Sequence, residues 1–165
     1  MGNNIVIISD TTAITNLYKI GKLQYIKWLF ANIIIPKSVL SELLELEKNG
    51  RNIDEIKKAD WITVASVNDT DLLAQLLTEL DLGEAESIAL AKEKSADYLI
   101  IDEKKGRNIA NNLNIKTIGI VGILIQLKHQ KKIPAIKPDL ELLREKAGFW
   151  LNEKLYRIIL ASENE

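Results

Sequence analysis

The chain has 165 residues, of which 47% are hydrophobic and 27% charged, and its formal net charge is −1. These values fit one globular domain with a sizeable core, and they exclude a disordered chain and a protein that wraps long duplexes by charge alone. Cysteine is absent, which excludes a disulfide framework and thiolate catalysis.

Short apolar runs alternate with amphipathic segments along most of the chain. Buried strands are predicted at 5–8, 33–35, 61–65, 98–101 and 116–120. Helices are predicted at 12–20, 38–48, 69–80, 84–94, 106–112 and 121–131. This alternation predicts an α/β fold, a mostly parallel β-sheet flanked by helices.

The pattern becomes purely helical after Pro134 and Pro138, through "PDLELLREKAG" and "FWLNEKLYRIILA". We therefore expect residues 133–165 to form a C-terminal helical extension packed on the domain formed by residues 1–132. Its aromatic residues Phe149, Trp150 and Tyr156 are expected to pack in the core, with a partner surface as the alternative.

Two predicted strands run directly into an aspartate, Asp10 in "IVIISDTTA" and Asp102 in "YLIIDEKKGRNIA". Ligands of open parallel sheets bind beyond the carboxyl ends of the strands, so both carboxylates are placed where chemistry is usually done. Each aspartate alone could instead cap the following helix or start a turn. Two equivalent positions favour a functional site.

Helical periodicity adds two glutamates to this candidate site. At about 100° per residue, Glu84 projects toward the apolar side of its helix, whereas Glu86 falls on the polar side. Glu42 borders the apolar stripe of the 38–48 helix, which is a weaker indication. An ordinary first-turn glutamate is the alternative for Glu84.

Converging carboxylates repel one another unless a cation neutralises them. Oxygen ligands without cysteine point to Mg²⁺ or Mn²⁺ rather than Zn²⁺. The single histidine, His129, lies at a lysine-rich helix end and is expected to be solvated. Polar and basic residues border the predicted site and are candidates for binding phosphate: Thr11, Thr12, Asn16, Lys104, Lys105 and Arg107.

Five segments together resemble the PIN-domain proteins, and specifically their toxin-like (VapC-like) bacterial and archaeal branch. They are "IISDTTAITNLYKIGKL", "IPKSVLSELL", "LDLGEAESIALAKE", "YLIIDEKKGRNIA" and "AIKPDLELLREKAGFW", in the family's order and over nearly the whole chain. The resemblance implies a PIN fold and a metal-dependent ribonuclease site at Asp10, Glu42, Glu84 and Asp102, with Thr11 shaping it. Many members carry aspartate where Glu84 stands, so Glu86 is an alternative ligand.

The resemblance implies cleavage of single-stranded RNA by a toxin of a toxin–antitoxin pair, with a small antitoxin and a homodimer. The alternative is a catalytically silent RNA-binding or protein-interaction module. A haloacid-dehalogenase phosphatase would need an aspartate where Thr12 stands, and no dinucleotide-binding or P-loop motif occurs. Without an apolar run of membrane-span length or a leader pattern, we expect a cytoplasmic protein that contacts no membrane.

Overall fold

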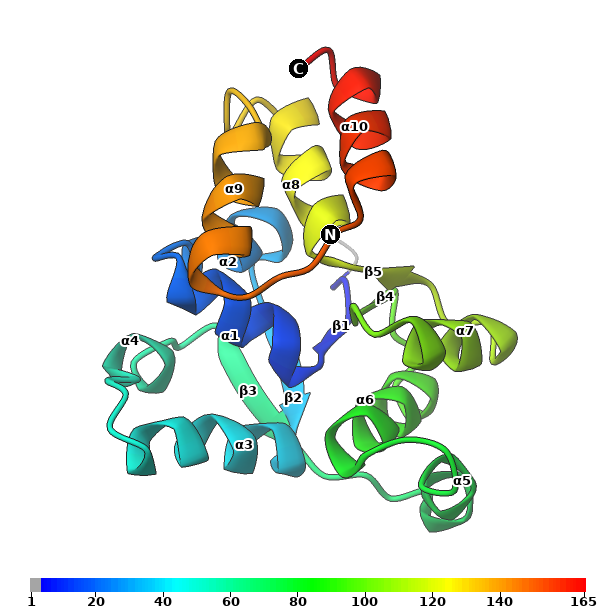
Figure 1. Ribbon diagram of the computed structural model, residues 1–165. Helices are drawn as coiled ribbons and strands as arrows, with labels where there is room; N and C mark the ends of the chain where they lie inside the picture. The colour runs from blue at the N-terminus through cyan, green and yellow to red at the C-terminus, as the bar shows by residue number, and fades with distance from the viewer. Residues whose placement is uncertain (1–3) are drawn as a thin grey trace.

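A computed structural model describes residues 4–165 (Figure 1). Its strands form one parallel sheet in the order β3-β2-β1-β4-β5. Their bounds are β1 (Ile7–Ser9), β2 (Ile33–Pro36), β3 (Ile62–Ala65), β4 (Tyr98–Ile100) and β5 (Thr117–Ile118). The predicted α/β fold, a parallel sheet flanked by helices, is thus confirmed.

The helices are α1 (Thr11–Lys19), α2 (Gln24–Phe30), α3 (Lys37–Lys48), α4 (Asp54–Lys57), α5 (Thr70–Leu76), α6 (Leu82–Glu93), α7 (Lys104–Asn112), α8 (Ile120–His129), α9 (Lys137–Lys146) and α10 (Glu153–Ser162). Sequence periodicity missed α2 and α4. Helix α2 begins just after the turn at Gly21 that ends α1, and α4 is a single turn, too short to show a period. Within residues 4–165, no helix is long and apolar enough to cross a membrane.

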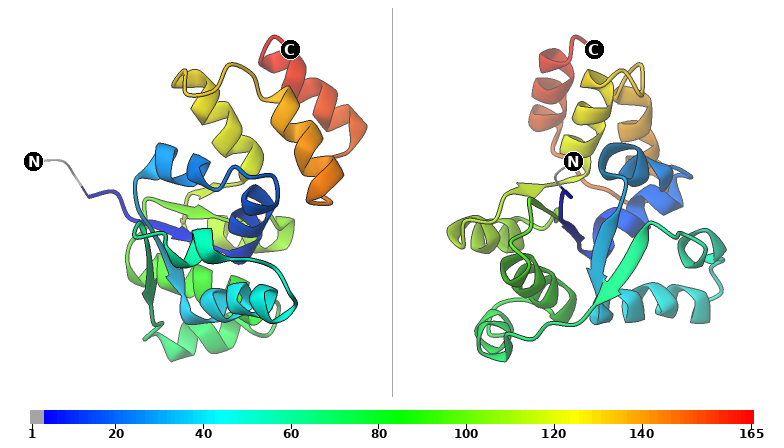
Figure 2. Two further views of the ribbon diagram at one scale, coloured as in Figure 1. Left: turned by 90° about the vertical axis from the view of Figure 1, so that its left-hand side faces the viewer. Right: turned by 180° about the vertical axis from the view of Figure 1, so that it is seen from behind.

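The central strands β1, β2 and β4 are largely buried, and their side chains alternate between two cores, one on each face of the sheet. Ile7 and Ile100 face a core that includes α1, α2, α3, α8, α9 and α10. Ile8 and Leu99 face a second core formed with α5, α6 and α7. Figure 2 shows the helices on the two sides of the sheet. Strands that are covered by helices on both faces need apolar residues at successive positions, which is the pattern in this sequence.

The strand order reverses at β1, which fixes the place of the candidate site. β1 pairs with β2 on one side and with β4 on the other, with Ser9 opposite Ile100. The chain moves outward from β1 to β2 and β3, then returns to β4 and β5 on the opposite side. Such a switch point leaves a crevice beyond the carboxyl ends of the two central strands, where Asp10 and Asp102 follow.

The C-terminal helices pack with α8 and α2 at one end of the molecule (Figures 1 and 2). Tyr156 is 9% exposed and lies in the core, as expected, and Phe149 packs against it half-buried. Trp150 does not meet this expectation, because it is 80% exposed in the loop between α9 and α10. A buried hydrogen bond of 2.8 Å, from the Tyr25 hydroxyl to Asp139 Oδ2, joins α2 to α9.

Removing this hydroxyl should weaken the attachment of α9. Tyr25→Phe leaves an oxygen of the buried Asp139 carboxylate without its donor, which costs roughly 1–3 kcal/mol for such groups. We expect urea unfolding to show a free energy of unfolding lower by about 2 kcal/mol. Tyr98→Phe, at a more exposed ring, is the control, and equal stability of the two variants would contradict the prediction.

Candidate metal and nucleic-acid site

Asp10 occupies the carboxyl end of β1 and the N-cap position of α1. Three buried strand residues lead into it, and the residue is only 4% exposed. Burial, opposed in part by the Thr11 amide and reinforced by the charges of Glu84 and Glu42, raises the pKa of Asp10 from 3.8 to about 7. The chain thus places a poorly solvated carboxyl group at the centre of its sheet edge.

Glu84 approaches Asp10 from the first turn of α6. Asp81 caps this helix by accepting the Glu84 amide at 2.9 Å. Burial and the neighbouring charge of Asp81 raise the pKa of Glu84, and Glu103 and Glu42 add to the effect. Asp81 also raises the pKa of Asp10. Sequence reasoning missed Asp81, although its spacing from Glu84 is that of a capping box.

Glu42 reaches the same region from α3. Its side chain is exposed, and its Oε1 lies against the backbone of Gly83, so that a Cβ built on Gly83 would overlap it. Glycine at this position in α6 therefore leaves the space that the Glu42 carboxylate fills. The structure brings together Asp10, Glu42 and Glu84, which come from three different elements.

Glu86 has another role. Its Oε2 accepts the backbone amide of Ser38 at 3.0 Å, at the N-terminus of α3. Helical periodicity placed Glu86 on the polar side of its helix, but that side is partly covered in the structure. Helix α6 packs against α3, α5, α7 and the sheet, so Glu86 is half-buried. Glu84 is accordingly the better placed of the two for the candidate site.

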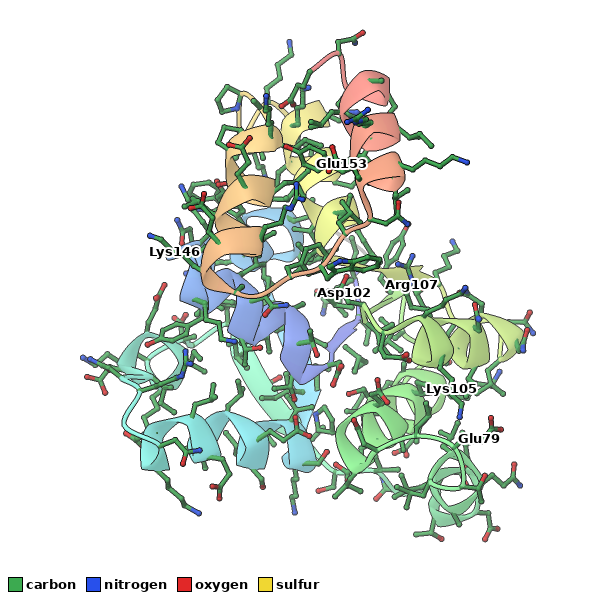
Figure 3. The ribbon with its side chains drawn as sticks, in the orientation of Figure 1. Glu79, Asp102, Lys105, Arg107, Lys146 and Glu153 are labelled. Atoms are coloured by element: carbon green, nitrogen blue, oxygen red, sulfur yellow. The ribbon has the colours of Figure 1, made fainter. Side chains whose placement is uncertain are left out.

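Asp102 follows β4 and points toward the start of α8. Its Oδ1 accepts the Ile120 amide at 3.0 Å, while its buried Oδ2 has no hydrogen-bond partner among residues 4–165. Burial raises the pKa of Asp102, against the opposing effects of the Ile120 amide and the Arg107 charge. In Figure 3, Asp102 and Arg107 are neighbours beneath the loop that joins α9 and α10.

The predicted phosphate-binding residues lie on α1 and α7. Thr11 is half-buried, Thr12 is exposed, and Asn16 is buried one turn further along α1. The Thr11 hydroxyl is a second buried polar group that lacks a partner within the described residues. Lys104 begins α7 and is exposed, whereas Arg107 is half-buried.

Several other charged residues have structural partners. Lys105 pairs with Glu79 at 3.7 Å on the surface. Glu103 caps α7 by accepting the Gly106 amide at 2.8 Å, and Asp97 accepts the Val6 amide at 2.7 Å. His129, expected to be solvated, has its Nε2 3.0 Å from Glu163 Oε2.

The donor set fits a hard divalent cation, although the ligands are not preassembled. No group of three or more aspartate, glutamate, histidine or cysteine side chains within residues 4–165 is arranged to hold a metal ion. Over the same residues, Asp10, Glu42 and Glu84 form no salt bridge with a lysine or arginine. A cation bound by oxygen ligands would relieve the repulsion among these three carboxylates. It could also give Asp102 Oδ2, which has no hydrogen-bond partner among residues 4–165, a partner.

Filling the space beside Gly83 should disturb Glu42 alone. Gly83→Ala places a methyl group where Glu42 Oε1 lies, and the exposed glutamate can swing away cheaply. Because alanine favours a helix more than glycine does, we expect unchanged or slightly higher stability. The Mg²⁺ concentration needed to raise the melting temperature by a given amount should increase about tenfold, which corresponds to a loss of about 1.4 kcal/mol of Mg²⁺-binding free energy.

The control for this variant is Glu45→Gln, which alters an exposed glutamate of the same helix that pairs with Lys48. Its Mg²⁺ dependence should match wild type. A Gly83→Ala protein that responds to Mg²⁺ as wild type does would remove Glu42 from the site.

Comparisons with known proteins show the family and the fold of the chain. The model of the DUF3368 family, a PIN-domain family, matches residues 6–165. Among solved structures, a PilT N-terminus domain protein, SSO1118 from the archaeon Sulfolobus solfataricus P2, is similar with a TM-score of 0.53 and 20% sequence identity. The similarity covers 74% of this chain and 92% of that one, and it concerns the fold. No curated protein matches the chain.

Proposed function

This chain belongs to the PIN-domain family, generally a nuclease fold, and from that premise we propose that it is a metal-dependent ribonuclease of single-stranded RNA. The observation that carries the proposal is the buried Asp10 carboxyl group at the switch point. It faces the charges of Glu84 and Glu42 and forms no salt bridge with a basic side chain within residues 4–165. Buried carboxyl groups that repel one another destabilise the fold, and such groups are typical of functional sites.

Four carboxylates would hold the ion, Asp10, Glu42, Glu84 and Asp102. When bound there, Mg²⁺ or Mn²⁺ supplies an activated water and neutralises charge on the phosphoryl group. In the hydrolysis, the water oxygen bonds to phosphorus, the bond from phosphorus to one sugar oxygen breaks, and that oxygen takes up a proton. The acidic residues would hold the ion from two helices, α3 and α6, and from the ends of two strands, β1 and β4.

The remaining residues orient the RNA. Thr11, Thr12 and Asn16 lie along the first turns of α1 and offer neutral hydrogen bonds to phosphate oxygens. Lys104 and Arg107 lie on the first turns of α7 and supply positive charge beside the acidic site. Single-stranded RNA fits this narrow basic border better than a long duplex does, since the chain's net charge is only −1.

Cleavage of a labelled single-stranded RNA pool tests the proposal. We expect cleavage with Mg²⁺ or Mn²⁺, none with EDTA, and a loss of at least about 1,000-fold in Asp10→Asn, as for groups that stabilise developing charge. The matched control is Asp60→Asn, an exposed aspartate beside β3 at the opposite, amino-terminal edge of the sheet. Equal cleavage by Asp10→Asn and wild type would refute the assignment.

Metal binding measured by calorimetry separates the proposal from a silent RNA-binding or interaction module. A nuclease should bind Mn²⁺ at millimolar or tighter concentrations, and Asp10→Asn should weaken that binding. Absence of both cleavage and Mn²⁺ binding would favour the silent module.

The resemblance to the toxin-like branch supports a finer proposal. We propose that the protein is the toxin of a toxin–antitoxin pair, acts as a homodimer and is covered by a small antitoxin. Induced expression in a bacterial host should then arrest growth, and Asp10→Asn should abolish the arrest. Light scattering after size exclusion tests the dimer.

A further inference from the structure

A cavity of about 460 Å³ lies directly beside Asp102. Its polar wall is formed by Asp102 and Arg107, and its apolar wall by Phe149, Trp150, Leu155 and Ile159 from the α9–α10 loop and α10. Figure 3 shows Asp102 and Arg107 together at the foot of this loop. The volume is in the range of small-molecule sites, and one wall is shared with the candidate catalytic site.

Trp150 lines this cavity but is not packed into the core. The indole is 80% exposed, whereas the neighbouring Phe149 is half-buried and packs against the core. Exposing the apolar surface of a tryptophan to water is unfavourable, and covering that surface with a ligand would be favourable. A large flat aromatic beside a basic side chain is the arrangement that single-strand binding proteins use to stack bases.

Arg107 is available to a ligand. Within residues 4–165 it forms no salt bridge, and its Nη1 lies 3.4 Å from the position that a Cβ on Gly119 would take. The absence of a side chain at Gly119, which also lines the cavity, leaves room for Asp102 and Arg107 on its polar side. A half-buried guanidinium that forms no salt bridge in the described part of the chain is a good phosphate ligand because it can donate two parallel hydrogen bonds.

We propose that this cavity holds one nucleotide of single-stranded RNA next to the scissile bond, with its base stacked on Trp150 and its phosphate bound by Arg107. The inference rests on the proposed function and adds to it a subsite formed by the C-terminal helices. Stacking on an indole accepts any base, so this subsite selects single strands rather than a sequence.

Binding of RNA without cleavage tests the subsite. The Asp10→Asn protein in EDTA is titrated against a fluorescein-labelled single-stranded RNA octamer of mixed sequence, and fluorescence anisotropy gives Kd. Adding Trp150→Ala should weaken binding about tenfold, and Trp150→Phe should restore most of it. Trp28→Ala is the matched control, since Trp28 is 44% exposed on α2 and does not line the cavity.

A second readout identifies the role of Arg107. Arg107→Gln should weaken binding about tenfold and reduce the slope of log Kd against log salt by about one. Trp150→Ala should leave that slope unchanged. Binding of the corresponding RNA duplex should be insensitive to Trp150→Ala, because its bases are already stacked.

The outcomes separate the subsite from the proposed function. Equal RNA affinity of Trp150→Ala and its parent, with matching melting curves, would overturn the subsite even if the wild type cleaves RNA. Failure of the parent protein to bind the octamer at micromolar concentrations would overturn it as well, and would favour a protein partner for Trp150. Binding that depends on Trp150, in a wild type that cleaves no RNA with metal, would support the subsite and reject the nuclease.

Discussion

The Asp10→Asn protein should be more stable than the wild type at pH 8 in EDTA, by about 4 kcal/mol. Burial and the charges of Glu84 and Glu42 raise the pKa of Asp10 from 3.8 to about 7. Each unit of pKa difference between the folded and unfolded states is worth about 1.36 kcal/mol. Ionising Asp10 therefore costs the folded state this free energy, and an uncharged amide of nearly the same shape avoids the cost.

The sign of the pH dependence follows from where the proton is held. Between pH 4 and pH 7 the folded protein keeps the Asp10 proton that the unfolded chain has lost, so stability from this group falls as pH rises. Below pH 4 both states are protonated and the penalty is absent. The stability difference between Asp10→Asn and wild type should accordingly grow from pH 4 to pH 7 and then level off.

Thermal unfolding from pH 4 to pH 8 measures this difference. A gain of about 4 kcal/mol corresponds to a melting temperature higher by roughly 10 °C at pH 8 for a chain of this size. Asp60→Asn, at a carboxylate that is 90% exposed, should melt like the wild type. Mg²⁺ should raise the melting temperature of the wild type and leave Asp10→Asn unchanged. A less stable Asp10→Asn protein at pH 8 would contradict the argument.

The fold was largely predictable because it depends on patterns that short sequence windows contain. Each strand is an apolar run ending at a turn or a capping residue, as in the segments around Ile8, Ile34 and Leu99. The alternation of strands and helices then leaves few parallel topologies. Helix α2 escaped prediction because the turn at Gly21 separates it from α1 by only a few residues, and its start has no side-chain cap.

The placement of the candidate site residues was predictable where it depends on the position of a residue at a strand end, and less so where it depends on helix packing. Asp10 and Asp102 follow from the strand ends alone. The direction of Glu84 was inferred from an amphipathic helix, yet α6 is buried on nearly all sides, so its periodicity did not show that Glu86 is partly covered. Trp150 was expected in the core because it is a large aromatic residue. The sequence does not show that its loop lines the Asp102 cavity and leaves the indole exposed.

Gly119→Ala should lower RNA cleavage about 100-fold. Gly119 has an extended backbone that any residue can adopt, so the effect is steric. A Cβ at this position would overlap Asp102 Oδ1, and its next neighbour is Arg107 Nη1 at 3.4 Å. Unlike the exposed Glu42 beside Gly83, Asp102 is held by the Ile120 amide at 3.0 Å, so it moves only by losing this bond. A displacement of about 1 Å at a reacting centre costs roughly 100-fold in rate.

A double-mutant cycle shows whether the loss acts through Asp102. If Gly119→Ala only displaces that carboxylate, it should add nothing to the loss caused by Asp102→Asn, and the two effects on kcat/KM will be far from additive. Additive losses would mean that the methyl group obstructs RNA entry into the cavity independently. Because a Cβ on Gly119 would also contact Arg107, a rise in KM with unchanged kcat would place its main effect on RNA binding.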